Sequence, residues 1–411
     1  MNRVLIVNAY ATRNHGDAAI IEGLVAALRD AGAEHVAVAA RTWRDEVDAW
    51  RALGADETVP PLAAVHGVPG WASRPRPLLL AYVCGVLAWA ALTVLVRRPS
   101  PGARPYLDAD LVVSAGGGYL GGPKPGINFV KVANVWFARV VRRPAFLAPM
   151  TITPPRGLVG RILRWGLAGT RIFVRDAPSK AVLAKLNLAS ELAPDLAFHA
   201  PSVRAAMARG TAMRTDRPTL MCWAPRSYRS DQDAWQERES LERRCVEAVS
   251  QVVGEGDMRL RFIPQVTAWD QDDDRLAIER LAAALPAEVS ARAEVAPPAA
   301  TLDEAIDQFA DCDVMLASRL HATILAAAVA VPSLSLAYEP KVAGVLGEIG
   351  LGERAVAVDA SWSSADLAGR LEGLLDPAER ERSRRAILDA ARGFEGLISA
   401  FRHGFARRRR R

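Results

Sequence analysis

Cysteine is scarce in this sequence, and the spacing of the few cysteines excludes the usual cysteine-built sites. The chain has four, Cys84, Cys222, Cys245 and Cys312, which lie far apart. No two of them form a CxxC pair, and no cluster of histidine and aspartate has the spacing of a metal site. We therefore expect a chain of the reducing cytosol with neither a disulfide nor a zinc site.

Signals for secretion, nucleic-acid binding and repeats are also missing. The first apolar run, VLIV, is too short for a signal peptide and leads directly into the polar stretch NAYATRNHGD. No basic recognition helix and no aromatic residues interleaved with basic ones are found. These absences favour a cytoplasmic globular protein that does not bind nucleic acid.

Positive charge is concentrated at the end of the sequence. The formal charge is +6, and the five terminal arginines account for most of it, so the rest of the chain is nearly neutral. Such a tail suits an anionic membrane surface, where each arginine contributes about 1 kcal/mol. A solvated, disordered end has the same composition, and this alternative stays open.

Strand-like and helix-like segments alternate along most of the 411 residues. This alternation predicts parallel sheets covered by helices, one sheet in each half of the chain. The predicted strands are RVLIVNA, HVAVAA, LVVSAGGG, PAFLAPM, RIFVRD, TLMCWAPR, LRFIPQ, DVMLASR and PSLSLAY. We place a first domain at residues 1–205, a second at 206–375 and a C-terminal helix with its basic tail at 376–411, with a hinge at 204–218.

Residues 78–96, LLLAYVCGVLAWAALTVLV, form an uncharged apolar run flanked by RPRP and RRP. Its length is close to the ~20 residues that span a bilayer. A span would place NHGD and SAGGG on opposite sides of the membrane, so we favour a helix lying on the cytoplasmic leaflet. Burial in the first domain or in a dimer interface is the alternative. The favoured interpretation predicts a cytoplasmic protein, peripheral at the inner face of the plasma membrane.

The segment SRLH follows the apolar strand DVMLA and opens an apolar helix that we expect to end before Pro332. The start of a helix has unpaired N–H groups and a positive dipole end. Beside it, Arg319 is suited to grip a carboxylate or phosphate, and His321 to donate a proton near neutral pH. The alternative is an arginine paired with a core carboxylate and a histidine bonded to backbone.

Other strand ends carry further candidates. In NHGD, Gly16 permits a tight turn, and Asp17 either caps the next helix or orients an acceptor hydroxyl. Taken alone, each arginine at a strand end is interpreted as an ordinary surface residue. Taken together, the strand-end arginines suit a ligand that carries both phosphate and carboxylate groups. The candidates beyond SRLH are Asn14, Gly16, Asp17, Gly116, Gly117, Gly118, Arg175, Arg226, Tyr338 and Lys341.

The motifs NHGDAAI, SAGGGYLGG, VRDAPS with APDLAF, SRLHATILAAAVAVP and AYEPK occur in this order. Together they resemble the polysaccharide pyruvyl transferase family over most of the chain, with SRLHA followed by P and YxxK as the most specific part. The resemblance implies an α/β fold with two Rossmann-like domains facing across a cleft, GT-B-like. We expect the apolar helical segment as an insertion in the first domain, and the resemblance does not account for it. It implies phosphoenolpyruvate as donor and co-substrate, no cofactor or metal, and a sugar of a surface glycan or its lipid-linked precursor as acceptor.

The family's cationic motif falls on Arg319, Leu320 and His321, which implies donor binding and acid catalysis there. In our hypothesis, Arg319, helped by Arg175 or Arg226, holds the donor. His321 protonates its methylene carbon, a sugar hydroxyl adds with Asp17 as base, and a second hydroxyl closes a ketal as phosphate leaves.

Two other functions stay open. A nucleotide-sugar glycosyltransferase of the same fold commonly carries two glutamates seven residues apart, whereas Glu339 and Glu348 are separated by eight. A membrane-associated, non-catalytic scaffold is the second alternative, although a scaffold has no use for the cations of SRLH.

Overall fold

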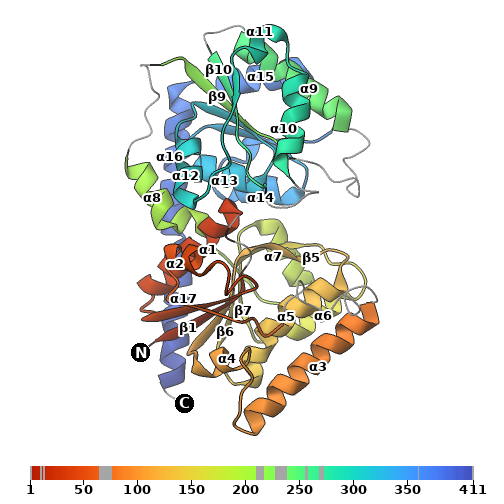
Figure 1. Ribbon diagram of the computed structural model, residues 1–411, viewed down its shortest axis with the longest axis vertical. Helices are drawn as coiled ribbons and strands as arrows, with labels where there is room; N and C mark the ends of the chain where they lie inside the picture. Colours follow the sequence, from red (N-terminus) through yellow and green to blue (C-terminus); the bar gives the residue numbers. More distant parts are fainter. Residues whose placement is uncertain are drawn as a thin grey trace. The chain divides into compact units, whose positions relative to one another are not determined.

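The computed structural model describes most of the chain as two compact units (Figure 1). Unit 1 comprises Met1–Thr12, Ile20–Ala200 and Arg392–Arg411; unit 2 comprises Arg13–Ala19 and Pro201–Ala391. The residues outside the description are 1, 10, 11, 13, 64–75, 210–216, 227–237, 255–257, 268–272, 360, 410 and 411.

Unit 1 contains a parallel sheet of eight strands in the order β3-β2-β1-β4-β6-β7-β8, with β5 paired to β6. The apolar runs RVLIVNA and HVAVAA form β1 and β2 as predicted. The strands are β1 (Arg3–Ala9), β2 (His35–Ala40), β3 (Glu57–Val59), β4 (Leu111–Ser114), β5 (Gly117–Gly121), β6 (Ala145–Thr153), β7 (Arg171–Val174) and β8 (Glu191–Leu192).

Helices pack on this sheet and bury a large apolar core. They are α1 (His15–Asp30), α2 (Val47–Ala52), α3 (Arg76–Leu95), α4 (Arg104–Asp108), α5 (Pro125–Val140), α6 (Val159–Leu167), α7 (Ala177–Lys185), the 3₁₀ helix Leu196–His199 and α17 (Phe394–Arg409). The first residues of α1 group with unit 2 and the remainder with unit 1.

Unit 2 contains a parallel sheet of six strands in the order β11-β10-β9-β12-β13-β14. Its strands are β9 (Thr219–Ala224), β10 (Met258–Phe262), β11 (Ala293–Val295), β12 (Val314–Ala317), β13 (Ser333–Ala337) and β14 (Ala355–Ala357). Its helices are α8 (Pro201–Ala208), α9 (Arg238–Gly254), α10 (Asp274–Ala283), α11 (Ala287–Ser290), α12 (Leu302–Ala310), α13 (Leu320–Ala328), α14 (Pro340–Glu348), the 3₁₀ helix Gly352–Arg354, α15 (Ser364–Gly373) and α16 (Pro377–Arg392).

The units do not follow the chain order that the sequence analysis assumed. The chain passes from unit 1 to unit 2 after Ala200, and α8 occupies the first part of the predicted hinge. The predicted separate segment 376–411 is divided, because α16 groups with unit 2 up to Ala391 and α17 groups with unit 1.

Helix α13 is shorter than expected. It ends at Ala328 rather than at Val331, because the backbone reverses at Ala330, which has a φ of 61°. The N–H of Val331 then bonds to the carbonyl of Ala326 and closes the helix.

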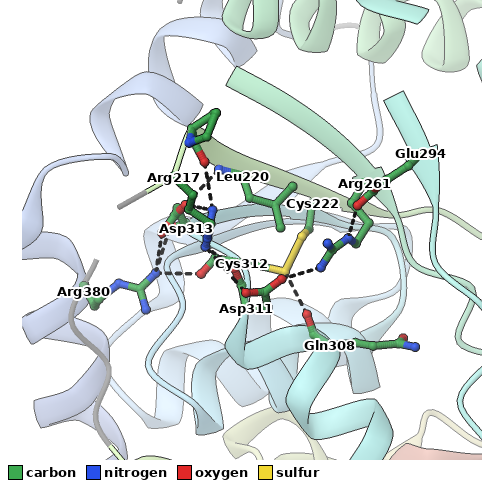
Figure 2. A network of polar contacts seen from close by, with 11 residues as sticks. Arg217, Leu220, Cys222, Arg261, Glu294, Gln308, Asp311, Cys312, Asp313 and Arg380 are labelled. Atoms are coloured by element: carbon green, nitrogen blue, oxygen red, sulfur yellow. Dashed lines mark hydrogen bonds and ion pairs between the residues drawn. A yellow bond between two sulfur atoms is a disulfide. The ribbon is translucent and has the colours of Figure 1, made fainter. Parts of the chain in front are cut away.

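The prediction of a chain without disulfides is wrong. Cys222 in β9 is bonded to Cys312, which precedes the neighbouring strand β12 (Figure 2). Both cysteines are buried, and the two strands pair directly. The contact brings together cysteines 90 residues apart, which sequence spacing could not reveal.

Ion pairs fix the chain on both sides of Cys312 (Figure 2). Arg217 donates to Asp313 at 2.8 Å, and Arg261 donates to Asp311 at 2.6 Å. Arg380 is buried and donates to the carbonyl of Cys312 at 2.7 Å. These contacts hold the entry to β12 and thereby the strand that carries Arg319 at its other end.

Candidate functional site

Three strand ends of unit 2 carry the polar side chains of the candidate site. Arg226 follows β9, Arg319 follows β12 and Tyr338 follows β13. These strands are parallel neighbours, so their carboxyl ends lie along one edge of the sheet. The chain continues from β9 to β10 on one side and from β12 to β13 on the other, so β9 and β12 flank the point where the strand order reverses. Open α/β sheets bind ligands at this point.

Arg319 is paired with a buried carboxylate that the sequence analysis did not identify. Its Nε lies 2.9 Å from both carboxylate oxygens of Asp274, and its Nη2 donates to Oδ1 at 2.6 Å. Asp274 opens α10 and also accepts the backbone N–H groups of Gln265 and Val266. The alternative of pairing with a core carboxylate is therefore the one observed. The pair fixes the Arg319 guanidinium at the strand end, and 12% of the side chain stays exposed.

The pairing of Arg319 with Asp274 affects how strongly this sheet edge attracts an anion. Burial raises the pKa of the Asp274 carboxyl, and Arg319 with the two backbone N–H groups opposes this rise. The ionised carboxylate offsets much of the positive charge that Arg319 presents to an anion. A ligand with several negative charges therefore needs the additional cations of the same edge.

Arg226 and Lys341 supply such cations around one aromatic ring. The Arg226 Cζ lies 4.4 Å from the centre of the Tyr338 ring, and the Lys341 Nζ lies 5.6 Å from it. The Lys341 Nζ is also 2.8 Å from the Glu339 carboxylate. Contact with an aromatic face restrains both cations, and the Glu339 carboxylate offsets part of the charge of Lys341. Tyr338 and Lys341, predicted as acceptor or loop residues, thus lie beside Arg226, which was predicted for the donor.

His321 lies in the first turn of α13 beside the segment that opens α1. Its Nε2 is 3.9 Å from the Asp17 Oδ1, and the two side chains are 21% and 20% exposed. Asn14 orients Asp17, since its Nδ2 donates to Oδ2 at 2.8 Å while its Oδ1 accepts the Gly16 N–H at 3.2 Å. A proton donor and a carboxylate, the two groups needed for acid and base catalysis, are thus adjacent and partly open to solvent.

Gly16 is required by this arrangement for steric reasons. A Cβ at this position would lie 2.1 Å from the Cγ of His321 and 2.2 Å from its Cβ. No side chain fits at such distances, so the backbone of α1 reaches the imidazole only because residue 16 is glycine. The predicted turn glycine therefore has a more specific role as the contact surface for His321.

Arg175 and the glycine-rich loop belong to unit 1. The Arg175 side chain is buried, pairs with Asp195 and donates from Nε to the Thr151 hydroxyl at 3.0 Å. These partners give it a structural role inside the unit instead of the predicted donor contact. Asp176, next in sequence, caps α7 by accepting the Ser179 N–H.

In the glycine loop, close backbone packing explains the composition. A Cβ on Gly116 would lie 2.5 Å from the carbonyl oxygen of Pro149. Gly117 has a φ of 127°, which favours glycine, and Gly118 follows it in β5. In unit 2, Leu320 opens α13 with its side chain buried, so its backbone N–H is the group that it offers to a ligand.

The family follows from comparison with known sequences. A profile described as polysaccharide pyruvyl transferase matches residues 14–340. The chain belongs to this family. The resemblance that the motifs predicted is confirmed, and the match contains the ends of β9, β12 and β13 with the site residues Arg226, Arg319 and Tyr338. A comparison with curated proteins finds no match.

Several solved structures of low sequence identity have the same fold. UDP-GlcNAc 2-epimerase from Neisseria meningitidis bound to UDP-GlcNAc gives a TM-score of 0.56 at 10% identity, with 98% of this chain and 100% of that chain covered. MurG from Acinetobacter baumannii gives 0.52 at 13% identity, with 98% and 100% covered. The glycosyltransferase of kitacinnamycin gives 0.52 at 15% identity, with 98% of each chain covered. These similarities confirm the predicted fold class of two parallel-sheet α/β domains, GT-B-like.

Proposed function

We propose that this transferase moves the enolpyruvyl group of phosphoenolpyruvate onto two hydroxyls of one sugar, forming a pyruvate ketal. The acceptor in this proposal belongs to a cell-surface glycan or its lipid-linked precursor. One observation carries the proposal: His321 beside Asp17, on a helix whose preceding residue Arg319 lies at the same sheet edge as Arg226. An acid, a carboxylate and fixed cations are what addition to an anionic enol ester requires.

The donor contacts in this proposal come from unit 2. Arg226 and Lys341 bind the phosphate and carboxylate, because both cations are held around the Tyr338 ring at this sheet edge. Arg319, whose Nε and Nη2 bond to Asp274, acts at the carboxyl end of β12 together with the N-terminal N–H groups of α13. We assign no role in donor binding to Arg175 or to a metal.

The reaction is a proton-coupled addition followed by substitution. His321 as imidazolium gives its proton to the methylene carbon, which leaves a cationic centre at the adjoining carbon. A sugar hydroxyl forms a C–O bond there, and Asp17 takes its proton and returns one to His321. The phosphate leaves with the electron pair of its C–O bond. A second hydroxyl then closes the ketal, and its proton leaves with the phosphate.

The proposal is tested with the full chain, phosphoenolpyruvate and a lipid-linked oligosaccharide extract from the source cells. We expect phosphate release together with a gain of one pyruvate ketal by mass spectrometry. His321→Gln removes the acid and should lower kcat about 10²–10⁴-fold. Arg226→Gln should lower kcat/KM for phosphoenolpyruvate about 10–100-fold, the value of a charged hydrogen bond.

Matched controls exist in the same chain. Arg244 has its Cζ 4.2 Å from the ring centre of Trp362, so Arg244→Gln removes the same kind of cation–aromatic contact outside the site. His403 is an exposed histidine of α17 and serves as the second control. Full activity of both His321→Gln and Arg226→Gln would refute the proposal. Release of a nucleotide from UDP- or GDP-sugars without use of phosphoenolpyruvate would instead establish a glycosyltransferase, and a scaffold would gain no thermal stability from phosphoenolpyruvate.

A further inference from the structure

Helix α3 exposes an apolar face to solvent along its described length. The side chains of Trp89, Leu92 and Leu95 are 62%, 50% and 79% exposed. The other exposed residues of this face, which recur at helical spacing, are Leu80, Ala81, Cys84, Gly85 and Ala88. None of them is charged. A surface helix of a globular protein normally carries charged and polar residues on this side.

The opposite face of α3 packs against the core of unit 1. Val83, Leu87 and Ala90 are buried in the core, and α3 packs against α5 (Figure 1). The exposed residues run from Leu80 to Leu95, and since 16 residues of α-helix extend about 24 Å, the exposed face is a long apolar strip. Exposed apolar strips of this size mark interaction surfaces. Among the described residues, no helix is long and apolar enough to cross a membrane.

The end of α3 presents two cations next to this strip. The helix closes by a bond from the Arg98 N–H to the carbonyl of Thr93, with Arg97 at a φ of 59°. Thr93 is buried and its hydroxyl accepts the N–H of Ser100, so the reversal is fixed. Arg97 and Arg98 are both exposed. They are therefore held at the end of the strip rather than on a loose segment.

Helix α6 also packs on α5, and it too has exposed apolar side chains next to exposed arginines. Trp165 in this helix and Leu158 directly before it are 47% and 61% exposed, and Arg161 and Arg164 are exposed beside them. The charge bias is regional, because residues 111–175 contain ten lysines and arginines and no aspartate or glutamate. This part of unit 1 is thus apolar, aromatic and cationic on its surface.

We propose that the apolar face of α3, flanked by Arg97 and Arg98, lies in the headgroup layer of an anionic lipid bilayer. Tryptophan, leucine and arginine in this arrangement are what such an interface binds. A second copy of the chain is a poorer partner, because a symmetric pairing through this face would bring the same cations together. The inference rests on the proposed function, because membrane contact would give the enzyme access to a lipid-linked acceptor, which is found only at a membrane.

Vesicle flotation with the full chain tests this surface without reference to turnover. We expect binding to phosphatidylcholine vesicles that contain phosphatidylglycerol, and much weaker binding to phosphatidylcholine alone. Arg97→Gln/Arg98→Gln should weaken binding to the anionic vesicles about 30-fold, since each cation near such a surface contributes roughly a fivefold effect. Trp89→Gln/Leu92→Gln should weaken binding to both kinds of vesicle.

Control residues with the same charge change or the same apolar character lie in unit 2. Arg384→Gln/Arg385→Gln removes two exposed arginines from α16, and Leu276→Gln/Leu388→Gln replaces two apolar residues that are 45% and 44% exposed. Both controls should float like the wild type. Equal flotation of the α3 variants and the wild type would overturn the inference, as would a concentration-dependent dimer that Trp89→Gln/Leu92→Gln dissociates. Thermal stabilisation by phosphoenolpyruvate, measured without vesicles, reports separately on the proposed function.

Discussion

Gly16 offers the sharpest test of the His321 geometry at the scale of one residue. Gly16→Ala places a methyl group where the imidazole ring lies, 2.1 Å from Cγ, so His321 must move or α1 must shift. We expect kcat to fall at least tenfold, with a loss of about 1–3 kcal/mol in the free energy of unfolding. Binding of phosphoenolpyruvate should persist, because the proposed cationic contacts remain. Initial rates measure kcat, and calorimetric titration measures the binding of phosphoenolpyruvate.

The control for this substitution is a glycine with open space around it. Gly369 lies in α15, and a Cβ there meets nothing within 4 Å. Gly369→Ala should leave kcat unchanged and add up to about 1 kcal/mol of stability through helix propensity. If Gly16→Ala turns over like the wild type, the contact with His321 has no catalytic importance.

His15 predicts a pH dependence of stability. Burial lowers the pKa of its imidazole below 6.5, opposed by the bond from Nε2 to the carbonyl of Ala299 and by Glu304. Below pH 6.5 the unfolded chain therefore binds a proton that the folded chain does not. Stability falls as pH drops through this window, by about 1.4 kcal/mol for each pH unit over which the states differ by one proton.

His15→Gln removes the titrating group while retaining an amide that can reach the same carbonyl. We expect urea midpoints measured between pH 7 and pH 5 to decline less steeply for this variant than for the wild type. His403→Gln, at an exposed position, should follow the wild-type slope. Parallel slopes for His15→Gln and the wild type would show that His15 does not titrate differently in the folded chain.

At the scale of elements, apolar runs bounded by turn residues predicted the central strands. β1 and β2 have the predicted bounds, and the runs that form β9 and β12 were also identified. The short edge strands β3, β8, β11 and β14 were missed. Strands of two or three residues carry too few side chains for a period-2 pattern, and their pairing depends on the neighbouring strand.

The candidate site was also predicted only in part. The positions of Arg226, Arg319 and Tyr338 were predictable, because each follows a recognisable strand and parallel strands end at one edge. The partner of Arg319 was not. In the sequence, Asp273 and Asp274 both precede an amphipathic pattern and both suit a helix cap, and Asp273 does cap α10. Only the fold brings Asp274 to Arg319 across 45 residues.

At the scale of the whole molecule, the chain returns to unit 1 at its end. Phe394, Leu397 and Phe401 of α17 are buried. Phe401 packs edge-on against Phe146 of β6, with 5.4 Å between ring centres, and Phe394 contacts His199. A helix was predicted at the end of the sequence, but the sequence could not identify the sheet that the helix covers, because many apolar surfaces accept the same apolar helix face.

This return makes the stability of unit 1 depend on residues far along the chain. Phe401→Ala should destabilise unit 1 by about 3–5 kcal/mol, the usual range for a buried phenylalanine. Hydrogen exchange should then rise in β4 and β6, because Leu111 and Phe146 border the same helix at Gly404, while β9 and β12 keep their protection. Leu388→Ala in α16, at a side chain 44% exposed, should change neither sheet. If Phe401→Ala instead raises exchange in β9 and β12 first, α17 supports unit 2, and the assignment of α17 to unit 1 is wrong.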